Sequence, residues 1–177
     1  DAVSAPAGLE GEGTEANPFL ICDAEDLEFF RASVNAGETK YNAPGVYVAL
    51  TADIDLASVA NWEPIGTWDY TFMGNFNGNG HTVTITTAVT GNYAGLFGYM
   101  RGGSVTNITV AGQIYATGNY VGALVGHTHT DRSKFSDIVI DNVTNNATVT
   151  GNGSYTGGII GCAQDTDFKN TITNNGT

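Results

Sequence analysis

Tyr93-Ala94-Gly95-Leu96-Phe97-Gly98 is a stretch that the chain spells almost identically twice more, as Val121-Gly122-Ala123-Leu124-Val125-Gly126 and Thr156-Gly157-Gly158-Ile159-Ile160-Gly161. Each copy places two small residues, two apolar residues and a glycine after a Gly-Asn or Gly-Ser turn and a tyrosine. Copies that recur at roughly 28 and 35 residues indicate an array of one supersecondary unit with insertions between copies. Such repetition favours a protein selected for stacking over one selected for catalysis.

A second signature follows each copy, as Val105-Thr106-Asn107-Ile108, Phe135-Ser136-Asp137-Ile138 and Phe168-Lys169-Asn170-Thr171. This match predicts that Asn107, Asp137 and Asn170 occupy equivalent corners, where stacked side chains hydrogen-bond between neighbouring coils.

A competing alignment rests on equal spacing from Asn107 to Gly122 and from Asn142 to Gly157, and it registers Ile114 on Val149. The two alignments differ by a few residues. We attribute the difference to an irregular loop around residues 131–134.

Each coil offers about three short apolar segments separated by Gly and Asn turns, which predicts three strands per coil stacked at about 4.8 Å. The expected fold is therefore all-β: a right-handed β-helix (β-solenoid). The predicted interior of this stack contains Leu96, Ile108, Ile114, Leu124, Ile138, Val149 and Ile159.

An N-terminal cap containing one short α-helix is expected to cover the first coil, because an uncovered end is an exposed sheet edge. Residues 18–22 predict a short strand, and Asp23 stands where an N-cap is needed. A helix is expected from about residue 24 to 36, ended by Gly37.

The chain divides into a lead-in (1–17), the cap with the first coils (18–90) and the repeats (91–177). The closing residues 174–177 match residues 145–148, in the middle of an earlier repeat. We therefore expect an array truncated within a repeat, whose partners include downstream repeats or domains of the same polypeptide.

Composition excludes several classes of partner. The 177 residues carry a formal net charge of −12 with only six Lys plus Arg, so neither nucleic acid nor anionic lipid is an expected partner. No stretch approaches the roughly 20 apolar residues of a membrane span, so no membrane insertion is expected. Several coils would separate Cys22 from Cys162, so both are interpreted as small buried residues rather than as a disulfide.

The repeat segments resemble the GLUG-motif repeat family of bacterial secreted and surface proteins. The resemblance extends to Asn17-Pro18-Phe19-Leu20-Ile21 and to Phe76-Asn77-Gly78-Asn79-Gly80-His81-Thr82. The family includes adhesin-like members and N-terminal regions of secreted immunoglobulin-A-directed metallopeptidases. The resemblance implies a β-helical fold, an extracellular or cell-surface location and a non-catalytic role in a larger protein. It implies no particular ligand and no site residues.

The densest aromatic group lies near Trp68, Asp69 and Tyr70, between Gly and Thr residues. These side chains either pack under the cap or expose a flat surface for a sugar ring or a partner side chain. We treat Trp68, Asp69 and Tyr70 as the candidate ligand-binding residues.

Two groups are candidate metal ligands. His127, His129 and Asp131 alternate, so on a strand they would share one face and hold a transition metal; otherwise they belong to a solvent-exposed insertion loop. Asp53 and Asp55 also alternate, and paired carboxylates bind calcium or simply remain solvated at the surface. No other cofactor is expected.

Function is expected to be binding rather than catalysis. The first hypothesis is adhesion or ligand binding, with a host or matrix glycan or protein as the ligand. The alternatives are a structural spacer or accessory domain of a secreted peptidase, and a polysaccharide-active enzyme. A polysaccharide-active enzyme would need a base, and a cation that neutralises the substrate's charge, among carboxylates. The basic residues here lie apart from the acidic clusters in sequence.

Overall fold

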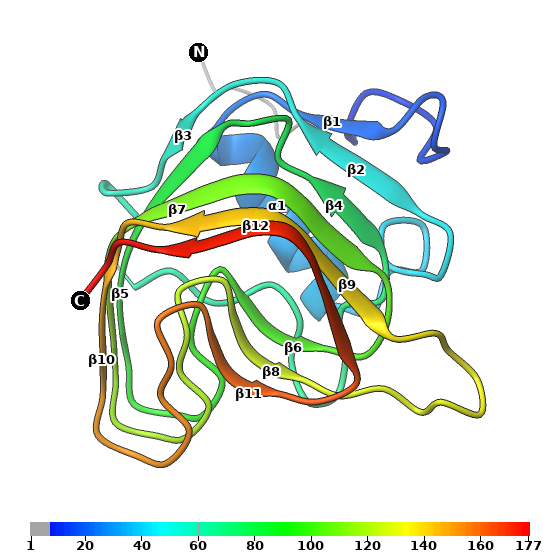
Figure 1. Cartoon of the computed structure of the whole chain (residues 1–177). Coiled ribbons are helices and arrows are strands. Elements are labelled where there is room, and N and C mark those ends of the chain that lie inside the picture. Colours follow the sequence, from blue (N-terminus) through cyan, green and yellow to red (C-terminus); the bar gives the residue numbers. More distant parts are fainter. Residues whose placement is uncertain (1–7, 60) are drawn as a thin grey trace.

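Parallel strands stacked on one another make up most of the molecule (Figure 1). The structure is a computed structural model that describes residues 8–59 and 61–177. Within these residues it contains twelve strands and one helix, and the strands of every ladder run parallel. The expectation of a mostly β fold with one short helix and parallel sheets is confirmed.

The twelve strands form two separate sheets. The nine-stranded sheet contains β1 (Phe19–Ile21), β2 (Tyr47–Leu50), β3 (Ile54–Asp55), β4 (Asn75–Asn77), β5 (Thr82–Val89), β7 (Ser104–Ala116), β9 (Ile138–Asn145), β10 (Thr148–Gly151) and β12 (Thr166–Asn174). The three-stranded sheet contains β6 (Phe97–Met100), β8 (Val125–Thr128) and β11 (Ile160–Ala163).

Register is regular along the stack. Phe19 pairs with Val48, Val48 with Phe76, and Phe76 with Val105, so these four residues form one column at intervals of 29, 28 and 29 positions. The chain therefore returns to the same place in the sheet about once every 28 residues.

The one long interval is explained by an insertion. Met100 pairs with Thr128 at an interval of 28 positions, whereas Ser104 pairs with Val139 at 35. The seven extra residues therefore enter between β8 and β9, in the loop of residues 129–137. The predicted pairing of Ile114 with Val149 is confirmed.

Asparagines form a ladder at one corner, but its members differ from those predicted. Asn107 Nδ2 donates to Asn77 Oδ1 at 3.2 Å, and Asn142 Nδ2 donates to Asn107 Oδ1 at 3.0 Å. Asn107, Asn142 and Asn170 have φ of 53°, 54° and 52°. The assignment of Asp137 to this corner is wrong, because the seven-residue insertion shifts it out of register and Asp137 pairs with Arg132 instead.

The last glycine of each repeat unit is required by space. A Cβ added to Gly126 would lie 2.5 Å from the Tyr120 carbonyl oxygen and 2.8 Å from that of Gly98. At Gly161 the same atom would lie 2.6 Å from the Tyr155 oxygen and 2.7 Å from the Gly126 oxygen. Both tyrosines have a left-handed backbone, with φ of 65° and 64°. In these two units the recurring tyrosine and glycine thus make one close backbone contact, whereas Gly98 in the first unit is restricted by the Gly66 oxygen at 2.5 Å.

Helix α1 (Ala24–Asn35) packs over the first coils. Asp23 is its N-cap and accepts a hydrogen bond from the Asp26 N–H at 2.9 Å, as predicted. The helix ends as expected, with Ala36 as the C-cap and Gly37 at φ 82°. It buries Leu27, Phe30, Ser33 and Val34. No helix within the described residues has the length and apolar character that a bilayer span requires.

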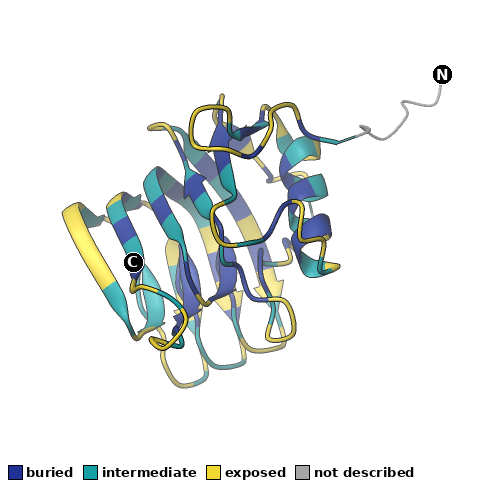
Figure 2. Ribbon diagram, turned by 90° about the vertical axis from the view of Figure 1, so that its right-hand side faces the viewer, coloured by how far each residue is buried: buried dark blue, intermediate teal, exposed yellow. Residues whose placement is uncertain are grey.

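Burial follows the stack and decreases at the last coil (Figure 2). The predicted interior residues Leu96, Ile108, Ile114, Leu124 and Ile138 are buried. Val149 and Ile159 are only partly buried, because the last coil has a neighbour on one side only. The interpretation of both cysteines as buried is wrong: Cys22 is exposed and Cys162 is half-buried, and both are free thiols.

We predict that Asn107→Ala destabilises the protein by about 2 kcal/mol. About half of this loss comes from forcing a Cβ-bearing residue without a local hydrogen bond into a left-handed backbone, and the rest from the broken ladder. Asn107→Gly is the matched control, because glycine adopts φ of 53° freely, and it should cost less. Urea unfolding measures both; equal losses would contradict the backbone part of this account.

Candidate functional site

Trp68 lies at the tip of a tight turn. The Thr67 N–H donates to the Tyr70 carbonyl oxygen at 2.9 Å, and the Tyr70 N–H donates to Thr67 Oγ1 at 3.1 Å, which leaves Trp68 and Asp69 at the apex. Trp68 is 66% exposed, and Asp69 is also exposed. Of the two alternatives for this turn, Trp68 takes the exposed one.

Tyr70 takes a different role from Trp68. Its ring covers Gly37, where an added Cβ would lie 2.5 Å from the Tyr70 Cε1 atom. Tyr70 thus packs on the end of α1 although 47% of it remains exposed. The two candidate aromatic residues therefore have different roles: Trp68 is exposed, and Tyr70 anchors the turn.

Trp68 also ends a strip of stacked rings that runs across the coils, and we call this set the aromatic strip. Its members are Trp68, Tyr93, Tyr99, Tyr120, His127 and Tyr155. Most of the stacked pairs are nearly parallel, with ring centroids about 5–6 Å apart, as stacked rings prefer.

The strip is built by the register of the repeats. Tyr93 and Tyr120 stack at 5.0 Å and 7°, and Tyr120 and Tyr155 stack at 5.0 Å and 5°. Trp68 stacks on Tyr99 at 5.7 Å and 8°. Burial raises the pKa of the Tyr93 and Tyr99 hydroxyls above the ordinary tyrosine value. Within the aromatic strip, neighbouring rings cover one another's faces. Only the rings at the ends of the strip therefore have a face that no other ring of the strip covers.

A groove of about 290 Å³ adjoins Trp68, and we call it the Trp68 groove. It is lined by Asn35, Glu63, Pro64, Gly66, Thr67, Trp68, Val89, Asn92 and Tyr93. Glu63 forms an ion pair with Arg31 at 2.9 Å. The Asn35 side chain donates a hydrogen bond to the Pro64 carbonyl oxygen and accepts one from the Gly66 N–H. An aromatic ring, amides and a carboxylate thus converge on one concave surface, which is the usual make-up of a ligand site.

Asp53 and Asp55 have different hydrogen-bond partners, Asp53 on the segment around Thr82 and Asp55 on its own local backbone. Asp53 Oδ1 accepts the Thr82 N–H at 2.9 Å and lies 3.1 Å from His81 Nδ1, and these contacts lower the pKa of Asp53. Asp55 Oδ1 accepts the Ala57 N–H at 2.8 Å. Calcium binding at this pair stays a prediction.

His127, His129 and Asp131, the other candidate metal ligands, have different surroundings, although the His127 and His129 rings stack at 6.1 Å. His127 lies in β8 and is buried between the Tyr99 and Tyr120 rings, at 4.8 and 4.7 Å. Asp131 instead accepts hydrogen bonds from the Ser133 side chain and backbone, which lower its pKa. In the described part of the chain, no three His, Cys, Asp or Glu side chains gather as a metal ion requires.

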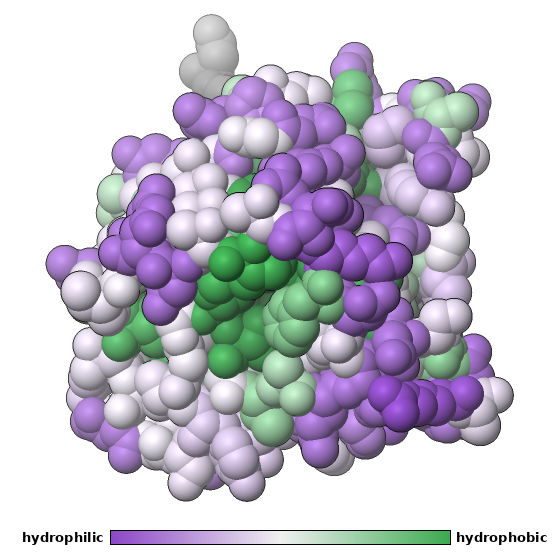
Figure 3. All heavy atoms as spheres, viewed as in Figure 1, coloured by the Kyte–Doolittle hydropathy of each residue, from purple (hydrophilic) through white to green (hydrophobic). Residues whose placement is uncertain are grey.

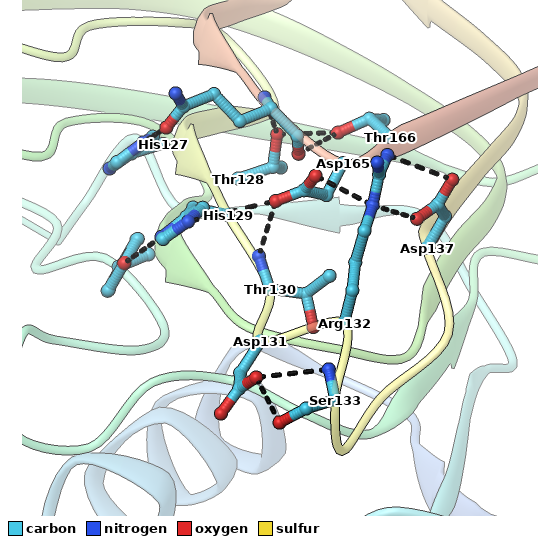
Figure 4. Close-up of polar contacts among 12 residues, drawn as sticks. His127, Thr128, His129, Thr130, Asp131, Arg132, Ser133, Asp137, Asp165 and Thr166 are labelled. Atoms are coloured by element: carbon cyan, nitrogen blue, oxygen red, sulfur yellow. Dashed lines mark hydrogen bonds and ion pairs between the residues drawn. The ribbon is translucent and has the colours of Figure 1, made fainter.

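His129 belongs to an ionic cluster that fixes the inserted loop (Figure 4). Arg132 Nε lies 2.9 Å from Asp165 Oδ1 and 3.1 Å from Asp137 Oδ1. Asp165 Oδ2 also accepts the Thr130 N–H at 3.3 Å and lies 3.7 Å from His129 Nε2. The insertion is therefore tied to the corner between β11 and β12 by one shared carboxylate.

Sequence reasoning missed most of the aromatic strip, although part of its signal was visible. Tyr93, Tyr120 and Tyr155 hold the same place before each repeat unit, and in a stacked array equivalent residues lie above one another. Tyr99 and His127 share a column because they pair directly between β6 and β8. Nothing in the order of residues indicated that Trp68 would stack on this column.

We predict that His127 makes the fold sensitive to mild acid. Burial lowers the pKa of His127, whereas an unfolded histidine titrates near pH 6.5, so below about that pH the unfolded chain binds a proton that the folded chain resists. Stability should therefore fall as pH decreases from 7 to 5. His127→Gln should flatten this part of the profile in thermal melts. The two proteins share every carboxylate, so carboxylate titration affects both in the same way. Parallel profiles of stability against pH for the two proteins would therefore contradict the prediction.

Comparison with known proteins gives two relatives and one solved structure. No family model matches the chain, so the GLUG-repeat resemblance stays a prediction. A protein of Evansella cellulosilytica named "Putative Gly-rich membrane protein" is 35% identical over 145 residues, which are 76% of this chain and 15% of that protein. "Halomucin" of Haloquadratum walsbyi is 31% identical over 178 residues, or 93% of this chain and 2% of that protein. The chain thus spans a small part of both relatives.

The solved structure is that of a "putative immunoglobulin A1 protease" from Bacteroides ovatus. It superposes with a TM-score of 0.59 at 21% identity, covering 93% of this chain and 56% of the other. At this identity the similarity concerns the fold. This chain is therefore similar in sequence to segments of two much longer proteins and similar in fold to part of a third.

Proposed function

We propose that the chain is a non-catalytic, extracellular β-solenoid module of a larger surface protein, and that it binds a host or matrix glycan or protein at Trp68. The observation that carries the proposal is the 66% exposed indole of Trp68, held over a groove of about 290 Å³. A rigidly supported, exposed tryptophan is unusual on a protein surface and is a frequent anchor in binding sites.

The solenoid part of the proposal is supported by the regular return of the chain. Columns such as Phe19, Val48, Phe76 and Val105 recur at one coil per 28 or 29 residues. Connections between parallel strands of one sheet are right-handed in nearly all proteins, which favours the right-handed form.

Support for Trp68 comes from its preorganisation. One face of the indole lies on Tyr99, and the turn that presents it is closed by two hydrogen bonds. Because the ring is already fixed, a ligand that stacks on its outer face loses little conformational entropy of the protein.

A non-catalytic role is supported by the state of the charged groups. Arg132, the cation closest to a carboxylate cluster, already pairs with Asp137 and Asp165. A polysaccharide-active site would need a cation free to neutralise the substrate. The extracellular location is supported by the names of the two relatives, a membrane protein and a halomucin.

An open stack end favours a second candidate, a spacer or accessory domain with further repeats of the same polypeptide. Apolar side chains gather in the middle of the face seen in Figure 3, over the last coil. Val149, Ile159, Ile160 and Ile172 are partly buried there, and β12 pairs only with β9 among the described strands. A coil stacked on this end would cover both the apolar groups and the strand edge.

Trp68→Ala is predicted to weaken ligand binding by at least about tenfold, as removal of a central aromatic anchor does. The unfolding free energy should fall by only about 1–2 kcal/mol, because the stacking on Tyr99 and on Tyr93 is lost. Glycan arrays and matrix-protein binding identify the ligand, and thermal melts test the fold. Phe168→Ala is the matched control, since Phe168 is 47% exposed and lies outside the Trp68 groove. A collapsed melt for Trp68→Ala would assign Trp68 to cap packing.

The spacer alternative has its own test, which is to append a second copy of residues 149–177 after Thr177. Thr177 is in register with Thr148, so the appended residues continue the coil in phase. Covering the partly buried isoleucines should raise the melting temperature by roughly 2–4 °C for each kcal/mol gained. A scrambled extension of the same composition is the control, and an equal shift with it would reject in-register stacking.

A further inference from the structure

A second concave surface crosses the outer face of the nine-stranded sheet, and its lining shares no residue with the Trp68 groove. A cavity of about 260 Å³ and another of about 500 Å³ share Asn75, Ser104 and Thr106 in their linings. The two cavities therefore adjoin and form one trough, which we call the sheet trough.

Register places the residues of the sheet trough in two rows. Tyr47 pairs with Asn75, Asn75 with Ser104, and Ser104 with Val139, so one row crosses β2, β4, β7 and β9. Asn77 and Thr106 pair in the adjacent row. On β4, β7 and β9 these side chains alternate with buried neighbours, so they face outward, and all of them, with Tyr47 of β2, are half-buried.

Loops close both ends of the sheet trough. Glu15 and Pro18, from the segment before β1, line the cavity at one end. Lys134 and Phe135, from the inserted loop, line the cavity at the other end. Both loops project on the right-hand side of Figure 1. The insertion that interrupts the repeat interval thus becomes one wall of a concave surface, and the Arg132 ion pairs hold it in place.

The chemistry of the lining selects among ligands. Asparagine amides and the hydroxyls of Ser, Thr and Tyr both donate and accept hydrogen bonds, as sugar hydroxyls require. An added peptide strand would need an open sheet edge, but β4 and β7 are paired on both sides. Glu15 and Asp137 line the trough, Lys134 at its end pairs with Asp131 at 3.4 Å, and the net charge is −12, so acidic chains are disfavoured.

We propose that the sheet trough binds an extended, uncharged oligosaccharide that lies across the strands. Neighbouring strands are about 4.8 Å apart, a spacing comparable to the length of one sugar unit, so successive units would meet successive strands. Tyr47 at one end and Phe135 at the other supply ring surfaces. This site shares no lining residue with the Trp68 groove and does not depend on it.

The test is affinity electrophoresis and calorimetry with neutral polysaccharides (mannan, xylan and mixed-linkage glucan) and with anionic ones (polygalacturonate and heparin). The wild-type protein should bind at least one neutral polymer more tightly than either anionic polymer. Thr106→Arg fills the centre of the sheet trough and should weaken that binding by at least about tenfold.

Thr84→Arg is the matched control, because Thr84 is a half-buried threonine on β5 of the same sheet and lines neither cavity. It should bind as the wild type does, and so should Trp68→Ala. Tyr47→Ala, a smaller change at the end of the trough, should also weaken binding. This variant replaces Thr106→Arg in the test if Thr106→Arg lowers the melting temperature of the protein. Failure of the wild type to bind any neutral polymer, or equal losses for Thr106→Arg and Thr84→Arg, would overturn the proposal.

Discussion

The close backbone contact at the last glycine of each repeat unit is the constraint on which the stack depends. The Tyr120 carbonyl oxygen approaches Gly126, and the Tyr155 oxygen approaches Gly161, at distances that exclude any side chain on the glycine. The contact requires a left-handed tyrosine in each coil, at φ of 65° and 64°. The first unit excludes a side chain on Gly98 as well, through the Gly66 oxygen, so the three units stay in one register and equivalent side chains lie above one another. The asparagine ladder and the aromatic strip are consequences of that alignment.

Stacking also decides which aromatic groups remain available for binding. Tyr120 has Tyr93 on one side and Tyr155 on the other, each at 5.0 Å, so its faces are occupied. Trp68 stacks on Tyr99 and Tyr93 and remains 66% exposed. The inner rings therefore stabilise the alignment, and the outermost indole is free to bind. The candidate site thus lies at the end of the aromatic strip, and no separate binding motif is needed to form it.

Much of the fold was predictable because it depends on repetition and on local chemistry. The repeat units, the Asp23 cap and the pairing of Ile114 with Val149 follow from spacing and residue type. The error at Asp137 arose because a seven-residue insertion makes two alignments compete, and only the paired strands decide between them. Trp68 could be named as a candidate because aromatic residues cluster around it in the sequence. Its stacking on Tyr99 and the sheet trough join residues far apart in sequence, so no local pattern contained them.

The inserted loop between β8 and β9 has a consequence for how such a module varies. Seven additional residues enter at a corner, and the strands after them resume the same columns, with Ile138 pairing to Thr166 at an interval of 28 positions. Length changes at this corner therefore leave the hydrogen-bonded frame intact, and only the outer contour of the molecule is altered. A lineage of such proteins is free to diversify its loops while its scaffold remains constant, much as an antibody domain varies its loops on an unchanging sandwich.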